Sequence, residues 1–300
     1  MKKQIIKTLG IAVMMAMSSL YVSAQMIHEF SVYGGGGLSA LRYDLSSGDR
    51  SGRMGGDFGV GYTFINGNWQ AAETGRVENA RWGLHTGIGF GLYNAKANLN
   101  NVTATSSNLT DEEGDRFRLN TTLKGYSEIQ NAFYLNIPVM GVYQTEIGSQ
   151  TLYGMGGIKF GIPIGSKFKA NNTTLENEAD YYEFENKLTG PQFAGYGNFN
   201  KSFDGDVGLG FCLIFALEGG AKWRISENLS IYTGLYFDYG LNNASKESYK
   251  DFINYSKDKP ADFTTNSVLT SYSKKSEAKI FTEKIHLIAV GIKVRVAIEK

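Results

Sequence analysis

Residues 207–225 read VGLGFCLIFALEGGAKWRI, and their side chains alternate in character at every second position. The odd-numbered positions are apolar, apart from one glycine. The even-numbered positions are mostly small or charged, and their charges are Glu218, Lys222 and Arg224. Alternation with a period of two indicates a β-strand with one apolar face. The run is also much longer than the roughly five or six residues of an ordinary strand.

The same alternation recurs in seven other segments, at 30–40, 53–64, 82–93, 133–144, 152–164, 229–241 and 285–298. In these segments the face opposite the apolar one is rich in glycine and carries only scattered charges. The exposed face of a soluble sheet would instead be crowded with Lys, Glu and Thr. A narrow membrane barrel needs small lumen residues and an apolar exterior. We therefore predict an all-β protein, an eight-stranded antiparallel up-and-down transmembrane β-barrel, closed because lipid tolerates no open edge.

The connections between the predicted strands alternate between short and long. Tight turns are expected at 147–150 and 226–228, and long polar surface loops at 42–52, 97–130, 168–206 and 242–280. Short periplasmic turns and long extracellular loops are typical of outer-membrane barrels. An even number of strands places both ends of the chain on one side. We therefore expect the outer membrane of a Gram-negative bacterium, with both termini in the periplasm.

The first residues have the three parts of a secretory signal peptide. A basic start with Lys2, Lys3 and Lys7 precedes an apolar stretch at 9–22, and small residues then lead to Gln25. The alternative is a buried N-terminal helix. We expect a signal peptide at 1–24 that is cleaved, leaving 25–300 as a single barrel domain. Cleavage removes three lysines, so the formal charge falls from +1 to about −2, with 27 basic against 29 acidic residues.

The composition excludes several other classes of protein. Glycine is abundant (37 residues) but proline is scarce (4) and there is no Gly-x-y period, which excludes collagen. The single cysteine, Cys212, excludes a disulfide scaffold. Basic and acidic residues nearly cancel, at 30 against 29, so the main sequence sign of nucleic-acid binding is missing. Beyond the first segment no apolar run reaches the ~18 residues of a transmembrane helix.

Five short motifs in the predicted strands carry a family resemblance. They are LNIP at 135–138, GIKFGIP at 157–163, ALEGGAKWR at 216–224, YTGLYFDYGL at 232–241 and IKVR at 292–295. These motifs resemble the small outer-membrane β-barrel family of Bacteroidetes, a porin family. The resemblance extends over nearly all of the mature chain. It implies an eight-stranded barrel similar in shape to the OmpA transmembrane domain.

The end of the chain departs from other barrels. It reads AIEK at 297–300, without the terminal aromatic residue that is familiar in proteobacterial barrels. Because the sequence stops with the last predicted strand, we expect no peptidoglycan-binding domain after it. Without this aromatic residue the signal that directs assembly is not identified, but the prediction of a barrel is unaffected.

The charges on the lumen-facing side of the strands predict how the barrel is closed. An eight-stranded barrel is barely wide enough for its own side chains, so acids and bases inside it should meet. Glu29, Arg53 and His85 share this face. The alternative is that each charge is separately solvated in a wet lumen. We predict a structural salt-bridge network of Asp57, Lys159, Glu218, Lys222, Arg224, Asp238, Lys293 and Arg295.

Catalytic, cofactor and metal sites find little support in the sequence. None of the three histidines, His28, His85 and His286, has the partners that acid–base or nucleophilic catalysis needs. The glycines at 34–37 and 87–91 lack the strand-to-helix context of a phosphate loop. The acidic runs at 111–113 and 204–206 are weak calcium candidates. We therefore expect no enzyme, no cofactor and no metal site.

Two functions from different classes remain open. The first is a structural, surface-interaction role, in which a rigid barrel presents loops 168–206 and 242–280 to an extracellular partner or ligand. The second is a narrow porin-like channel for small solutes, and a part in secretion machinery is a third. The expected partners are outer-membrane lipid and a molecule at the cell surface, without nucleic acid. We expect the chain to be a monomer.

Overall fold

The computed structural model describes residues 26–66, 80–147, 150–184 and 186–300. The predicted signal peptide at 1–24 and the middle of the predicted turn at 147–150 lie outside the described residues. The described chain is built from strands and short 3-10 turns, so the predicted all-β class is confirmed. No described helix is long and apolar enough to cross a membrane.

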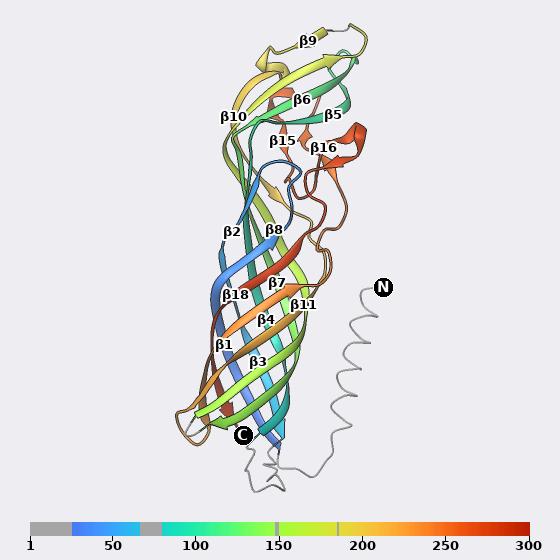
Figure 1. Ribbon diagram of the computed structural model, residues 1–300. Helices are drawn as coiled ribbons and strands as arrows, with labels where there is room; N and C mark the ends of the chain where they lie inside the picture. The colour runs from blue at the N-terminus through green and yellow to red at the C-terminus, as the bar shows by residue number, and fades with distance from the viewer. Residues whose placement is uncertain (1–25, 67–79, 148–149, 185) are drawn as a thin grey trace.

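Eight long strands form a ring of antiparallel pairs. Figure 1 shows how the strands of this ring are arranged. Each strand pairs with the next in chain order, β8 pairs with β11 as well as β7, and β18 pairs with β1, so the path of pairs returns to its start. The strands of this ring are β1 (Met26–Arg42), β3 (Met54–Asn66), β4 (Ala80–Leu99), β7 (Tyr126–Ile147), β8 (Gln150–Tyr181), β11 (Cys212–Arg224), β12 (Leu229–Gly240) and β18 (His286–Glu299).

Further strands lie outside the ring, so a count of eight does not describe the whole sheet. Three 3-10 turns, η1 (Gln192–Ala194), η2 (Pro260–Asp262) and η3 (Lys275–Glu277), connect some of them. The additional strands are β2 (Asp49–Gly52), β5 (Val102–Thr110), β6 (Arg116–Lys124), β9 (Asn186–Leu188), β10 (Gly197–Asp206), β13 (Lys250–Asp251), β14 (Ile253–Asn254), β15 (Thr264–Thr265), β16 (Ser271–Lys274) and β17 (Lys279–Ile280).

The inside and the outside of β8 exchange character along its length. In its first half, exposed Leu152 and Ile162 alternate with buried Met155 and Lys159. A β-bulge lies where Gly165 and Pro163 face Phe133 and Tyr134, and it shifts the alternation by one residue. Just beyond the bulge Phe168 and Ala170 point inward and are buried, while Lys167 and Lys169 are exposed.

The predicted long loops 97–130 and 168–206 are wrong as loops, because most of their residues form strands. β4 continues to Leu99, β7 starts at Tyr126, and β8 continues to Tyr181. β5, β6 and β10 complete these regions and pair with one another or with β8. Their outward residues are polar, so these strands lack the apolar outer face from which the other strands were predicted. The alternation of burial nevertheless continues through β6 and β8.

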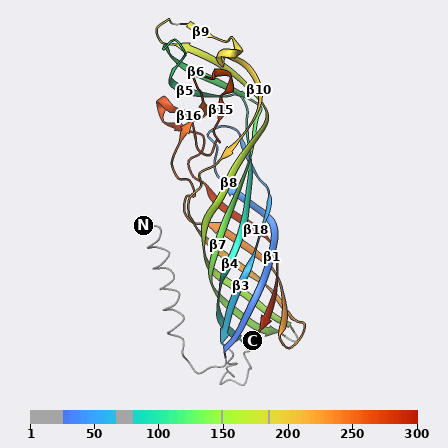
Figure 2. The same ribbon diagram turned by 180° about the vertical axis from the view of Figure 1, so that it is seen from behind.

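These upper strands and residues 242–280 form a second body at one end of the ring, which we call the cap (Figure 2). We call residues 242–280 the strap. The apolar core of the cap joins strap residues Phe252, Val268 and Leu269 to Phe117 and Tyr126 of the strands. The C-terminus lies at the opposite end, where the Glu299 amide donates to the Asn228 carbonyl in the β11–β12 turn.

The first residues of the predicted strand 207–225 lie elsewhere than expected. β11 begins at Cys212 rather than at residue 207. Val207 and Leu209 are buried in the core that continues into the cap, although their parity predicted the outer face. The reason is that these two residues lie in the connection from β10 to β11, so the two-residue period of β11 does not extend to them.

Candidate functional site

The interior of the ring carries buried charges at three successive levels, and the level nearest the C-terminus centres on Lys222. The Lys222 Nζ lies 2.5 Å from a Glu29 carboxylate oxygen and 2.6 Å from a Glu299 carboxylate oxygen. The Tyr232 hydroxyl donates to both Glu29 oxygens, at 2.6 and 2.9 Å. Two acids therefore share one lysine at this end of the lumen, and Glu29 also binds a phenol.

The middle level centres on Glu218. Arg295 Nη2 donates to both of its carboxylate oxygens, at 2.8 and 3.0 Å, and the Tyr153 hydroxyl donates to one at 3.1 Å. His85 lies beside this pair, with its Nδ1 2.8 Å from the Thr63 hydroxyl and 3.5 Å from Arg295 Nη1. Glu218 is thus held by donors from two other strands.

The upper level links two lysines through Asp57. The Lys293 Nζ lies 2.7 Å from Asp57 Oδ2 and 3.5 Å from Glu218 Oε2, which connects this level to the one below. The Lys159 Nζ lies 3.9 Å from Asp57 and donates to both oxygens of Asp238, at 2.7 and 2.8 Å. Asp238, Lys159, Asp57, Lys293, Glu218 and Arg295 therefore form one continuous chain of opposite charges.

Small residues between these strands let the charges meet. Gly35 of β1 pairs with Asp57 on one side and with Lys293 on the other. A Cβ atom on Gly35 would lie only 2.5 Å from Asp57 Oδ1, so a side chain there would occupy the space of the carboxylate. The glycine-rich face predicted from the sequence thus has a steric reason at this point.

The structure buries seven of the eight predicted network residues in the lumen and leaves one outside. Six of the seven form the chain of opposite charges, and Lys222 is paired separately, with Glu29 and Glu299. Arg224 is exposed, because it lies two residues beyond Lys222 at the end of β11, past the rim of the ring. Arg53 is exposed as well, at the break between β2 and β3, where its backbone still bonds to Ser39 of β1 and Asn94 of β4. The seven buried residues are Asp57, Lys159, Glu218, Lys222, Asp238, Lys293 and Arg295.

One acid and four phenols of the lumen contact these charges but are missing from the predicted network. Glu299 has the same parity as Lys293 and Arg295, so extending the alternation of β18 by two residues would have found it. The lumen tyrosines also occupy inward positions of the alternation, but aromatic residues are common in any strand and so did not mark this site. Two of them lie under Lys293, whose Nζ is 4.9 Å from the Tyr33 ring centre and 4.6 Å from that of Tyr236. The four phenols are Tyr33, Tyr153, Tyr232 and Tyr236.

An apolar layer follows the charges toward the cap. Tyr93 lies two residues beyond Gly91, the strand partner of Asp57, and packs edge-on against Tyr134 at 5.8 Å between ring centres. Ile214 and Leu287 are fully buried in the same cluster. The lumen is therefore filled in two ways, by paired charges and then by apolar side chains.

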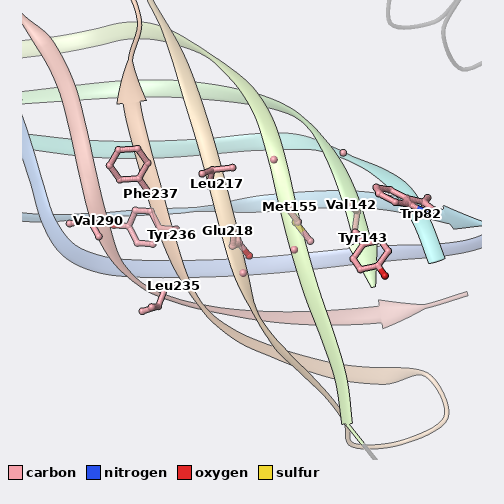
Figure 3. Close-up of a pocket in the computed structure, with 14 residues that line it drawn as sticks. Trp82, Val142, Tyr143, Met155, Leu217, Glu218, Leu235, Tyr236, Phe237 and Val290 are labelled. Carbon is pink, nitrogen blue, oxygen red and sulfur yellow. The ribbon is translucent and has the colours of Figure 1, made fainter. Parts of the chain in front are cut away.

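A hollow of about 770 Å³ lies on the outer wall of the ring rather than in the lumen (Figure 3). Trp82 and Tyr143, with ring centres 4.6 Å apart, line one part of it, and Leu217 and Leu235 line another. Its lining also includes Gly141, Gly154, Gly156 and Gly219. The lining is mostly apolar, and its carboxylate, Glu218, is already paired with Arg295.

The other sequence candidates have structural contacts of their own. The Asp111 Oδ1 accepts hydrogen bonds from the amides of Glu113, Gly114 and Asp115, which makes a turn between β5 and β6. Burial opposes ionisation of Asp111, but these bonds and one from the Tyr181 hydroxyl outweigh it and hold the pKa of Asp111 below its ordinary value. Among the described residues no group of three or more His, Cys, Asp or Glu is placed to hold a metal ion.

Two histidines lie near opposite ends of the ring and outside the charge network. The His28 Nδ1 is 2.6 Å from the Tyr62 hydroxyl, and the His286 Nδ1 is 2.9 Å from the Gly240 carbonyl oxygen. Neither has a carboxylate or a nucleophile among these partners.

Comparison with known proteins finds remote likenesses only. No protein-family model and no curated protein matches the chain. Among solved structures it is similar to Neisserial surface protein A, at 8% identity and a TM-score of 0.27, over 90% of this chain and 95% of that one. It is also similar to a major outer membrane protein from Thermus thermophilus, at 13% identity and a TM-score of 0.32, over 91% and 99%. Both TM-scores are low, so these likenesses add nothing to the description of the ring, which rests on the strand pairing of the chain itself.

Proposed function

We propose that this chain is an outer-membrane β-barrel whose eight ring strands cross the bilayer as a closed barrel. The proposal rests on a reversal of polarity between ring and cap. The ring has apolar side chains outside and charged ones inside, whereas the cap has charged and polar side chains outside. Leu235 is 66% exposed and Trp82 67% exposed on the outer wall of the ring, while Lys293 and Arg295 are buried within it. Water would favour the opposite arrangement, whereas lipid requires apolar side chains outside.

The length of the apolar outer face fits a bilayer. On β8 this face runs from Leu152 to Ile164, somewhat more than the ~9–11 residues with which a tilted strand crosses the hydrocarbon. It ends at the β-bulge, after which Lys167 and Lys169 point outward. We place the outer boundary of the membrane at this bulge, so that the cap stands in water outside the cell and both termini lie in the periplasm.

Within this framework the barrel has a structural, surface-interaction role, and its cap is the part that meets a partner or ligand. The filled lumen supports a role without transport, since ion pairs and an apolar layer follow each other along it. The outer end of the cap exposes three large aromatic side chains, Tyr182, Phe184 and Phe193. Exposed aromatic residues on a water-facing surface are common anchors in binding.

A narrow channel for small solutes is the second candidate. Three buried lumen atoms support it: Asp57 Oδ1, Tyr236 Oη and Arg295 Nε have no hydrogen-bond partner among the described residues. Polar atoms of this kind are commonly satisfied by water, and water in the lumen is a first requirement for conduction.

Planar-bilayer recording separates the two candidates. The purified mature protein, inserted in a lipid bilayer, is expected to give no stable conductance, because the ion pairs close the lumen. A stable open pore of defined conductance would overturn the sealed barrel and favour the channel. A Glu218→Gln variant serves as the comparison, since loss of that carboxylate opens the middle level of the network and should raise any residual current.

A further inference from the structure

The strap is held in the cap by both apolar and polar contacts. Phe252 packs edge-on against Tyr126 of β7 and against Phe281, with ring centres 5.6 Å apart in each pair. Val268 and Leu269 are fully buried. The strap strand β16 pairs with β5 of the cap (Figure 1). The strap therefore fills the interior of the cap rather than extending freely into solvent.

A buried carboxylate, Glu128 of β7, is one of the polar attachments of the strap, besides hydrogen bonds such as that from the Tyr255 hydroxyl to the Ala194 carbonyl oxygen. Glu128 accepts hydrogen bonds from the strap through the Ser267 hydroxyl and through the Val268 amide, the latter at 3.2 Å. On its own strand it accepts from the Tyr126 hydroxyl and from Gln130 Nε2, both at 2.8 Å. Four donors thus converge on one carboxyl group, two from the strap and two from β7.

No cation of the described chain neutralises this carboxylate. Glu128 is fully buried, and none of the ion pairs between described residues includes it. Its strand partners on both sides are alanines, Ala97 of β4 and Ala170 of β8. Lys96 and Lys169 on the same strands have the alternate parity and are less buried.

The other elements that the structure describes bring no charge into direct contact with Glu128. From the segment after β1, the Tyr43 hydroxyl donates to Gln130 Oε1 at 2.7 Å, and Arg50 lies 5.8 Å from the centre of the Tyr43 ring. From the strap, Asp251 is paired with Lys275 at 3.0 Å. An ionised Glu128 therefore depends on neutral donors alone.

We propose that Glu128 is a proton-sensitive latch, which fastens the strap into the cap and loosens it when the carboxyl group ionises. Opening the strap would return Glu128 to water, and an ionised carboxylate gains far more from hydration than a neutral carboxyl does. This inference goes beyond the proposed surface role and requires no particular partner.

The direction of the pH response follows from the environment of Glu128. Burial raises its pKa, and the hydrogen bonds from Ser267, Gln130, Tyr126 and Val268 counteract only part of this effect. The ordinary value for Glu is about 4.3. A raised pKa in the closed cap means that the stabilisation by Glu128 is complete below about pH 4.3 and is lost as the pH rises through the folded-state value. The strap should therefore open more readily at pH 8 than at pH 5.

Hydrogen exchange of the mature protein in detergent micelles tests the latch. Amides at 264–271 report on the strap, those of β18 serve as internal reference, and rates are corrected for the intrinsic pH dependence of exchange. We expect strap opening in the wild type to rise several-fold from pH 5 to pH 8 while β18 stays unchanged. Glu128→Gln should abolish this rise. Glu176→Gln, at a partly exposed cap carboxylate paired with Lys124, should retain it.

A second variant tests the strap side of the same contact. Ser267→Ala removes one donor to the carboxylate and should increase strap opening roughly tenfold or more at pH 8, as expected for a hydrogen bond to a charged group. A wild-type strap without pH response, or a Glu128→Gln variant that keeps the response, would overturn the proposal. If Glu128→Gln does not fold, Ser267→Ala decides, and unchanged strap exchange in that variant contradicts the latch.

Discussion

Lys293 of β18 and Asp57 of β3 form an ion pair across the intervening strand β1, with the Lys293 Nζ 2.7 Å from a carboxylate oxygen of Asp57. Between them lies Gly35, which pairs with both residues. Two strands that are not neighbours are thus joined through the lumen. The contact depends on the missing side chain of the strand between them.

Gly35→Ala should therefore destabilise the protein. The added Cβ would lie 2.5 Å from Asp57 Oδ1 and 3.2 Å from the backbone oxygen of Ile292, so the carboxylate has to move. Overpacking of this kind costs about 1–3 kcal/mol. Urea unfolding in lipid vesicles measures the change. Gly34→Ala is the matched control, because a Cβ there meets nothing within 4 Å. Equal stability of the two variants would contradict the assigned packing.

Glu218→Gln should be more costly, because it leaves Arg295 and Lys293 without their shared carboxylate. Breaking a buried ion pair by removing one partner typically costs about 3–5 kcal/mol. The temperature at which the folded band disappears on a gel, and urea unfolding, should both fall. Glu176→Gln in the cap, where the pair with Lys124 is partly exposed, should change little. Unchanged heat stability of Glu218→Gln would show that the lumen charges are separately solvated.

Leu235→Arg distinguishes lipid from water outside the ring. In water an arginine at this exposed position would be harmless, whereas in the bilayer it should cost about 2–4 kcal/mol near the midplane. Asn200→Arg on the exposed face of β10 in the cap is the control and should be neutral. Unfolding of both variants in vesicles gives the comparison. An equally stable Leu235→Arg protein would argue against a lipid-facing wall.

The turn at Asp111 should depend on pH in the acid range. Because hydrogen bonds hold the pKa of Asp111 below its ordinary value, its stabilisation of the turn is present above about pH 3.9 and is lost as the pH falls through the folded-state value. Asp111→Asn replaces the charged carboxylate, which accepts from the Tyr181 hydroxyl, with a neutral amide. Exchange of the amides of residues 113–115 should be faster than in wild type at pH 7, and the difference should vanish in acid. A constant difference at every pH would contradict this role.

The ring could be predicted from the sequence because its strands have one continuous apolar face. In β11, β12 and β18 the parity of buried and exposed residues follows the predicted alternation, apart from a few intermediate positions and the exposed Arg224 at the end of β11. The charges Asp57, Lys159, Glu218 and Lys293 could be placed in the lumen for the same reason. Asp238 and Arg295 were predicted there too, but which acid pairs with which base could not be predicted, because the pairing depends on strand register.

The cap could not be predicted, because its strands have a polar outer face and a bulge interrupts their period. On β8 the extra residue at 164 shifts the parity, so that Phe168 points inward where an unbroken alternation would turn it outward. Glu128 fell in a region predicted as a loop, 97–130. Its role depends on Ser267, almost 140 residues later in the chain, and no local pattern indicates that contact.

Cysteine labelling of living cells with a membrane-impermeant maleimide tests directly whether the ring crosses the outer membrane with the cap outside. The only native cysteine, Cys212, is buried and gives little background. Glu112→Cys places a thiol on the cap, and Glu227→Cys places one in the β11–β12 turn at the opposite end. A membrane-spanning barrel predicts that Glu112→Cys is labelled in intact cells, whereas Glu227→Cys is labelled only after the outer membrane is permeabilised. Labelling of Glu227→Cys in intact cells, or of neither variant, would contradict this topology.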